Sequence, residues 1–129
     1  MEFKIGNTKI GKNYPTYFIA ELSCNHHGSL KKAIELVRLA HKAGANAFKT
    51  QTYTGDTITF NCDKEDFILK GTKWDSEGTL WKLFNKAHTP WEWNKIIKDE
   101  TEKLGMDFIS SPFDETAVDH LEKLGVHAY

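Results

Sequence analysis

The sequence is poor in the residues that mark several classes of protein. It contains only two cysteines, Cys24 and Cys62, in 129 residues. They form neither a CxxC pair nor a disulfide framework. We therefore expect free thiols in a cytoplasmic protein, with Cys24 as a less favoured candidate nucleophile. No hydrophobic run approaches the roughly 18 residues of a membrane span. The polar N-terminus lacks the hydrophobic region of a signal peptide, so we expect no membrane partner.

Neither sign of charge dominates the chain. Lysine and arginine number 17 against 18 for aspartate and glutamate, and the formal net charge is −1. Binding through nucleic-acid phosphates needs a basic excess, so nucleic acid is not an expected partner. A hydrophobic share of 40% and a charged share of 27% are ordinary for a globular protein. The length suffices for one domain with a hydrophobic core.

The first part of the chain alternates between two hydrophobic periods. Residues 3–10 alternate around Gly6-Asn7, which predicts a short β-hairpin. Residues 17–22 form a continuous apolar run of the length of a buried strand. Apolar residues then recur at helical spacing between Ser29, a suitable N-cap, and Gly44. Residues 47–52 again have the composition of a strand.

The second part begins with a long polar connection over residues 53–78, and loops of this length in compact domains are usually functional. Thr89, Pro90 and Glu92 have the pattern of a capping box. Periodicity and turn residues predict the other elements: helices over 80–87, 90–104 and 115–124, and strands over 107–111 and from residue 126.

A repeated unit organises these elements. Three helices end in Lys-Ala-Gly44, Lys-Leu-Gly105 and Lys-Leu-Gly125, and each is followed by an apolar strand. Alternation of strand and helix predicts a parallel sheet in an α/β protein. We divide the chain into residues 1–16, hairpin and lead-in, and residues 17–129, three βα units and the start of a fourth strand. A (β/α)₈ (TIM) barrel needs about 250 residues, so on that interpretation the chain is a truncated, N-terminal portion.

Polar residues collect at the predicted carboxyl ends of the strands, where parallel α/β folds bind ligands. They are Glu21, Lys49, Gln51, Ser110 and Ser111. A lysine with serine hydroxyls suits an anionic substrate, since both donate to phosphate or carboxylate oxygens. A glutamate there is suited to general acid or base work. An ion pair inside a barrel remains the alternative for the two charged residues.

The adjacent histidines His26 and His27 suggest a metal site, but their spacing disfavours it. Adjacent side chains of an extended segment point in opposite directions, and no HxxxH or HxE pattern is present. Together with Asn25 and Gly28, they are more simply interpreted as the loop that enters the first helix. We therefore assign no metal ligand in this sequence.

Three segments together resemble the sialic acid synthase family: "AELSCNHHGS", "KAGANAFKTQTY" and "FISSPFDETAVDHLEKLG". Within that family, "DKEDFILKGTKWD" and "AHTPWEW" are most similar to the pseudaminic acid synthases. The resemblance extends over nearly the whole chain from about Tyr17. Each motif is moderately specific, whereas their order and spacing together are highly so.

The resemblance implies a fold and a reaction. Members of the family have a (β/α)₈ barrel and condense phosphoenolpyruvate with an N-acetylated amino sugar to give a nonulosonic acid, usually as homodimers. By this resemblance Glu21 is the catalytic glutamate of the first barrel strand, and Lys49 and Ser111 contact phosphoenolpyruvate. Gln51, Asn25 and Ser110 match motif positions whose contribution to substrate binding is assigned less firmly.

The resemblance also implies a divalent metal, Mn²⁺ or Mg²⁺, whose histidine ligands lie on later strands outside this chain. Two alternatives stay open. Lys49 could instead be the Schiff-base lysine of a class I aldolase. The 129 residues could also be inactive in isolation, because they lack the metal ligands.

Overall fold

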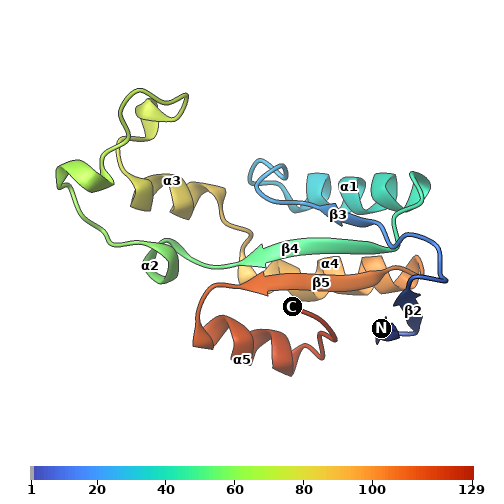
Figure 1. Ribbon diagram of the computed structural model, residues 1–129. Coiled ribbons are helices and arrows are strands. Elements are labelled where there is room, and N and C mark those ends of the chain that lie inside the picture. Colours follow the sequence, from blue (N-terminus) through green and yellow to red (C-terminus); the bar gives the residue numbers. More distant parts are fainter. Residues whose placement is uncertain (1) are drawn as a thin grey trace.

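The computed structural model describes residues 2–129 and contains a parallel sheet covered by helices and a separate antiparallel hairpin (Figure 1). The sheet consists of β3 (Ile19–Glu21), β4 (Ala47–Thr52) and β5 (Asp107–Pro112) in that order. The middle strand, β4, pairs in parallel with both neighbours. This arrangement confirms the predicted α/β class with a parallel sheet.

Three helices follow the strands: α1 (Leu30–Lys42), α4 (Trp91–Lys103) and α5 (Glu115–Lys123). The predicted N-caps of two of them are confirmed. The hydroxyl of Ser29 accepts a hydrogen bond from the N–H of Lys32 at 3.3 Å, and the carboxylate of Asp114 accepts from the N–H groups of Thr116 and Ala117. Both caps satisfy backbone donors that a first helical turn leaves free.

The predicted capping box of α4 is wrong. Pro90 is the residue that precedes the helix, with φ −52° and ψ 131°, and no side chain caps the first turn. Thr89 is therefore one residue too early to reach the helical N–H groups. Its hydroxyl is buried and makes no hydrogen bond within the described part of the chain.

The hydrophobic core lies on one face of the sheet, which we call the helix face. Phe48 of β4 and Phe108 of β5 pack there against α1, α4 and α5. The buried members of the core are Leu22, Ala33, Val37, Phe48, Ile97, Met106, Phe108, Leu121 and Val126. Successive strand residues alternate between faces, so Lys49 and Gln51 lie on the opposite face, which we call the inner face.

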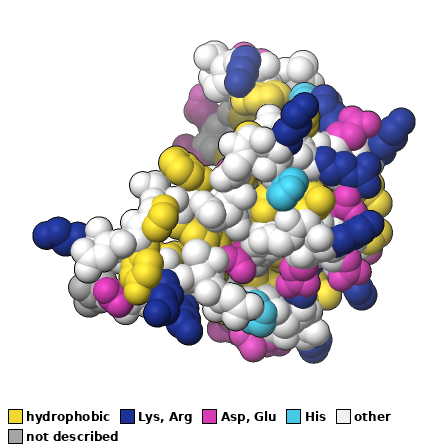
Figure 2. Space-filling model, turned by 90° about the vertical axis from the view of Figure 1, so that its right-hand side faces the viewer, with side chains coloured by type: hydrophobic (Ala, Val, Ile, Leu, Met, Phe, Trp, Pro, Cys, Tyr) yellow, Lys and Arg dark blue, Asp and Glu magenta, His cyan; other side chains and the backbone are white. Residues whose placement is uncertain are grey.

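The N-terminal hairpin is confirmed, with β1 (Glu2–Ile5) and β2 (Thr8–Gly11) joined at Gly6-Asn7. It lies at the amino ends of the strands (Figure 1). Gly6 has φ +53°, and a Cβ added there would collide with the carboxylate of Asp107, so the hairpin turn packs directly against β5. The hydroxyl of Tyr17 donates to the same carboxylate at 2.6 Å. Figure 2 shows this side of the molecule, on which acidic and basic side chains are interspersed.

A long excursion leaves β4 at the other end of the sheet. It contains α2 (Gly55–Ile58), two 3₁₀ turns (Glu65–Phe67 and Asp75–Glu77) and α3 (Leu80–Ala87). Figure 1 shows residues 55–79, which we call the arm, extending beyond the carboxyl ends of the strands. None of the helices in residues 2–129 has the length and apolar character needed to cross a membrane.

The strand predicted from Val126 onwards is not formed. The N–H of Gly125 donates to the carbonyl of Glu122 and that of Val126 to the carbonyl of Leu121, which closes α5. The Val126 side chain is buried in the core. A strand requires ladder pairing as well as an apolar pattern, and these last residues take part in no ladder.

Candidate functional site

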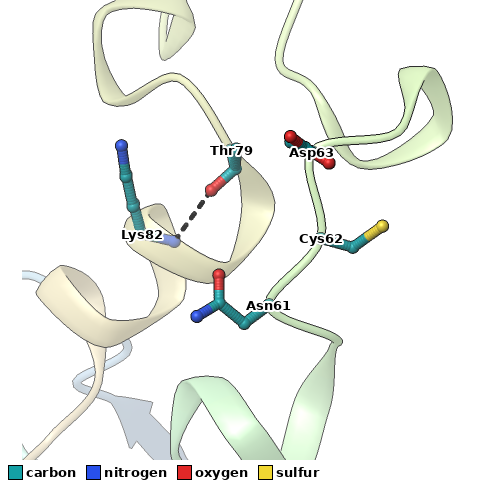
Figure 3. Close-up of a pocket in the computed structure, with 5 residues that line it drawn as sticks. All are labelled: Asn61, Cys62, Asp63, Thr79 and Lys82. Carbon is teal, nitrogen blue, oxygen red and sulfur yellow. Dashed lines mark hydrogen bonds between the residues drawn. The ribbon is translucent and has the colours of Figure 1, made fainter.

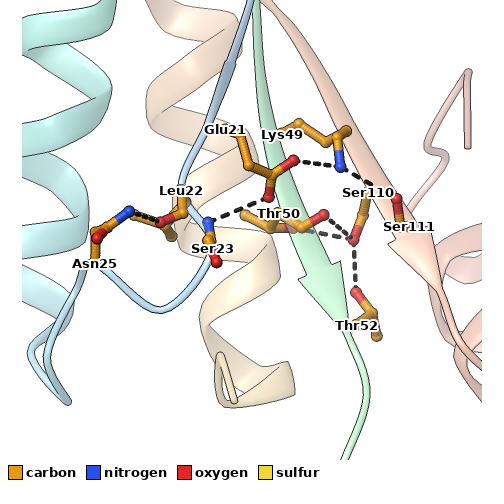
Figure 4. Close-up of polar contacts among 9 residues, drawn as sticks. All are labelled: Glu21, Leu22, Ser23, Asn25, Lys49, Thr50, Thr52, Ser110 and Ser111. Carbon is orange, nitrogen blue, oxygen red and sulfur yellow. Dashed lines mark hydrogen bonds and ion pairs between the residues drawn. The ribbon is translucent and has the colours of Figure 1, made fainter. Parts of the chain in front are cut away.

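The carboxyl ends of the three strands bring together Glu21, Lys49 and Ser111 (Figure 4). Glu21 of β3 and Lys49 of β4 are register partners, and the Lys49 ammonium forms an ion pair with Glu21 Oε2. Lys49 Nζ also donates a hydrogen bond to Ser111 Oγ of β5 at 3.2 Å. The three residues span 90 positions of the sequence, from Glu21 to Ser111. The parallel register of the strands makes them neighbours.

The Glu21 carboxylate is held on both sides. Its second oxygen, Oε1, accepts a hydrogen bond from the backbone N–H of Ser23 at 3.2 Å. The side chains of Lys49 and Glu21 are 27% and 34% exposed, so the pair is open to solvent and to a ligand. An ammonium group has three donors, of which Glu21 and Ser111 take two. The group therefore presents a fixed positive charge with donor capacity to spare.

The loop between β3 and α1 begins beside this pair. Its start is fixed by the hydrogen bond from the N–H of Leu22 to the carbonyl of Lys49, at 2.9 Å. Asn25 Nδ2 donates to the carbonyl of Leu22 at 2.9 Å. Ser23 and His27 have positive φ angles of 47° and 48°. Such angles are uncommon outside glycine and cluster at functional sites.

Ser110 is not part of this group. It lies on the helix face, is fully buried, and donates to the backbone carbonyl of Thr50 at 3.2 Å. The hydroxyls of Thr50 and Thr52 lie 3.0 and 2.7 Å from its Oγ. A direct contact between Ser110 and a ligand on the inner face, as its place in the motif led us to expect, does not agree with this geometry.

A cleft of about 810 Å³ adjoins the carboxyl ends of the strands and separates the β3–α1 loop from the arm and α3. Asn25 and Gln51, both predicted site residues, line it. The other lining residues are Ser23, Cys24, His27, Gly28, Tyr53, Lys73, Trp74, Glu77, Leu83, Phe84, Lys86 and Ala87. The long connection, which the sequence predicts to be functional, therefore forms one wall of the cleft.

The wall formed by the arm, α3 and Tyr53 combines apolar and charged groups. The Lys73 ammonium lies 4.8 Å from the centre of the Trp74 ring, and Lys86 forms an ion pair with Glu77. Tyr53 is buried, and burial raises the pKa of its hydroxyl above the ordinary value. The sequence predicts an amphipathic helix after a long loop, but its pattern does not indicate which of these side chains face the strand ends.

The two adjacent histidines have different environments. His26 is buried, its Nδ1 accepts a hydrogen bond from the N–H of Gly28 at 3.0 Å, and its ring lies edge-on to Trp93. Burial lowers the pKa of His26 below the ordinary value. His27 instead lines the cleft. Within residues 2–129, no three His, Cys, Asp or Glu side chains are grouped so that they could hold a metal ion.

A second hollow, of about 410 Å³, lies on the arm and is lined by Asn61, Cys62, Asp63, Thr79 and Lys82 (Figure 3). The Thr79 hydroxyl accepts a hydrogen bond from the N–H of Lys82 at 3.3 Å and thereby caps α3. This hollow contains none of the predicted site residues.

Comparison with known proteins identifies the family of the chain. The sequence model described as the NeuB family matches residues 36–129, which is well over half of the chain. The chain belongs to the NeuB family. It is 44% identical over 126 residues to pseudaminic acid synthase of Campylobacter jejuni, a match that covers 98% of this chain and 36% of that protein. N,N'-diacetyllegionaminic acid synthase of Legionella pneumophila is 32% identical, with 90% and 32% covered.

Two crystal structures share the fold. The N-acetylneuraminic acid synthetase of Leptospira borgpetersenii superposes with a TM-score of 0.75 at 30% identity, over 98% of this chain and 39% of that chain. The spore coat polysaccharide biosynthesis protein SpsE of Bacillus subtilis gives 0.70 at 27% identity, over 97% and 31%. The chain thus spans about a third of the length of its relatives, in keeping with an N-terminal portion of their fold.

Proposed function

We propose that this chain supplies the phosphoenolpyruvate-binding part of a nonulosonic acid synthase. The observation that carries the proposal is the junction of Glu21, Lys49 and Ser111 at the strand ends, next to a cleft large enough for a sugar. Membership of the NeuB family and the similarity to pseudaminic acid synthase support it.

In the proposed reaction, the methylene carbon of phosphoenolpyruvate forms a carbon–carbon bond to the aldehyde carbon of an N-acetylated amino sugar. Water adds to the cationic carbon that results, and the C–O bond to phosphate breaks. Lys49 and Ser111 bind and orient the anionic enolpyruvate, a positioning role. The Glu21 carboxylate pairs with the same ammonium and therefore lies next to the bound enolpyruvate. From there it directs water and receives or returns a proton.

The sugar occupies the cleft between the β3–α1 loop and the arm. Gln51 and Asn25 line its floor near the strand ends, and Trp74, Leu83 and Phe84 provide apolar surface for acyl and other methyl groups. The mixture of apolar walls and a few polar groups is typical of sites for small polar molecules. We propose an acceptor of the pseudaminic or sialic acid type on this basis.

In this proposal a divalent cation, Mn²⁺ or Mg²⁺, would supply the Lewis acid that polarises the sugar aldehyde. The residues described do not fit such an ion, since no suitable ligand group occurs among residues 2–129. We propose that its ligands lie outside this chain. We also propose a cytoplasmic enzyme that acts in surface polysaccharide or glycan biosynthesis and, in its full-length form, is a homodimer.

A chimera tests the proposal. Residues 1–129 replace the matching segment of the Campylobacter jejuni pseudaminic acid synthase, and formation of pseudaminic acid is measured. We expect activity in the chimera and a loss of about 100-fold in Lys49→Met, since a charge-assisted contact to the anion and its orientation are both removed. Lys95→Met, an exposed lysine paired with Asp99 on α4, is the matched control and should retain activity. A Lys49→Met chimera as active as the control would contradict the proposal.

Lys49 as the Schiff-base lysine of a class I aldolase is the second candidate, favoured by its position on a strand. A Schiff base requires an uncharged amine, whereas Lys49 Nζ is held in an ion pair with Glu21. Borohydride reduction in the presence of pyruvate, followed by peptide mass spectrometry, distinguishes the two. A covalent adduct on Lys49 would replace the synthase proposal with the aldolase.

The isolated 129-residue chain is expected to be inactive because it lacks metal ligands. Release of phosphate from phosphoenolpyruvate in the presence of an N-acetylated amino sugar and Mn²⁺ measures this directly. Turnover by the chain alone would show that the account of the metal ligands is wrong.

A further inference from the structure

We propose that Thr50, Thr52, Ser110 and Asn94 form a positioning network that holds Lys49 and Ser111 in place from the opposite face of the sheet. The relevance of this network to substrate binding rests on the function proposed above. Its mechanical part, the control of the Lys49–Ser111 contact, can be measured without any substrate.

The network is fully buried and continuous. Asn94 of α4 donates through Nδ2 to Thr52 Oγ1 at 3.1 Å, and its Oδ1 lies 3.5 Å from Thr50 Oγ1. Thr52 Oγ1 and Ser110 Oγ are 2.7 Å apart, and Ser110 Oγ donates to the carbonyl of Thr50 at 3.2 Å. One consistent direction runs from Asn94 through Thr52 and Ser110 to the Thr50 carbonyl, so that each hydroxyl in this path both donates and accepts. Thr50 Oγ1 donates to Ser110 Oγ at 3.0 Å.

The location of these hydroxyl groups is unusual for core positions. The same face of β4 and β5 carries Phe48 and Phe108 two residues earlier, packed in the hydrophobic core. Hydroxyl groups replace apolar side chains only over the last residues of the two strands. Burying them contributes little to stability by itself, because each lost its hydrogen bonds to water. A satisfied buried network does, however, restrict the structure to a single arrangement.

The backbone ladder between the two strands ends at the same place. Thr52 and Pro112 are its last register partners, and the N–H of Phe113 still donates to the carbonyl of Thr52 at 3.2 Å. Side-chain hydrogen bonds between Ser110 and both threonines add cross-strand contacts to these last pairs. The hydrogen bond from Asn94 to Thr52 also connects the end of β4 to α4, so the strand ends are held to the helix layer as well as to each other.

The network residues are joined directly to the site residues through single peptide units. Thr50 follows Lys49, and Ser110 precedes Ser111, with the side chains on opposite faces. Peptide units are planar and stiff, so a displacement of Ser110 moves Ser111 as well. The Lys49 ammonium ends a flexible side chain, and its place is set by its acceptors, Glu21 and Ser111.

Competitive acetylation of lysines tests the mechanical part on the chain itself. The rate at Lys49 is compared with that at exposed Lys31 by peptide mass spectrometry. Ser110→Ala leaves the buried Thr50 and Thr52 hydroxyls short of a partner, and we expect relative acetylation of Lys49 to rise roughly threefold or more. Ser111→Ala, which removes the acceptor itself, should give a similar rise. Thr101→Val is the matched control, because Thr101 is a buried hydroxyl on α4 that bonds only within its own helix, to the Ile97 carbonyl.

A fourfold variant separates positioning from stability. In Thr50→Val, Thr52→Val, Asn94→Leu and Ser110→Ala combined, no hydroxyl is left unpartnered, so urea denaturation should show stability near that of the parent. We still expect faster acetylation of Lys49 in this variant. Parental acetylation in a variant of parental stability would overturn the inference. If the combined variant does not fold, the acetylation rate of Lys49 in Ser110→Ala is measured and corrected for the fraction of that variant that is unfolded. A rate equal to that of the parent would then overturn the inference.

Titration with phosphoenolpyruvate separates this inference from the proposed function. We expect the parent chain to bind it and the fourfold variant to bind about tenfold more weakly. Equal affinity in both would overturn the link to substrate binding. Absence of binding in the parent would count against the proposed function, while the acetylation result would still decide the positioning role.

Discussion

Glu21→Gln should separate phosphoenolpyruvate binding from acid–base catalysis at the strand ends. The substitution neutralises the carboxylate while keeping its shape. In the structure Glu21 competes with any anion for the Lys49 ammonium. The side chains are 27% and 34% exposed. Exposed ion pairs contribute about 0.2–1 kcal/mol, and partial burial places this pair at the upper end, about 0.5–1 kcal/mol.

Removing that competitor should strengthen phosphoenolpyruvate binding by the same amount, which corresponds to roughly a two- to fivefold lower Kd. Titration calorimetry on the chain measures the change. The gain should shrink as salt is added, since screening weakens a partly exposed pair. The Gln side chain still offers an oxygen to the N–H of Ser23, so the loop should be unaffected.

Turnover should move in the opposite direction. In the chimera with the Campylobacter enzyme, Glu21→Gln should lower kcat by about 100-fold or more, the usual contribution of a general acid or base. Weaker phosphoenolpyruvate binding in Glu21→Gln, comparable to that in Lys49→Met, would refute the reasoning. In that case the carboxylate would be part of the binding site rather than a competitor for the lysine.

Three further predictions concern stability and use urea denaturation of the chain. Gly6→Ala should cost about 1–2 kcal/mol, because a Cβ at φ +53° meets the Asp107 carboxylate; Gly44→Ala, which meets no atom, is the control for positive φ alone. Leu121→Ala should cost about 2–5 kcal/mol as a fully buried core truncation, and a cost below 1 kcal/mol would contradict its place in the core. His26 has a pKa lowered by burial, so the folded state binds fewer protons than the unfolded state. Stability should therefore fall as the pH drops below about 6.5, the ordinary histidine pKa, and less so in His26→Asn; an equal fall in both would assign the effect to other groups.

Local patterns predicted most of the elements because they depend on neighbours in sequence. The helix between Ser29 and Gly44, the strand over residues 47–52 and the hairpin turn at Gly6-Asn7 all follow from period, caps and turn residues. The capping box at Thr89 and the strand from Val126 were wrong for a related reason. In both segments the residue types fit the predicted element. A capping threonine, however, must directly precede the first helical residue, and a strand must pair with a neighbouring strand.

The composition of the strand ends was determined by the sequence itself, since Glu21, Lys49 and Ser111 follow apolar runs that predict parallel strands. Their convergence was decided by the register of β3, β4 and β5, which no local pattern specifies. The same register separated Ser110 from Ser111. Adjacent strand residues must face opposite sides, but only the packing of Phe48 and Phe108 against the helices decides which side is the core. Ser110 thereby lies in a buried network, and Ser111 lies beside the ammonium of Lys49.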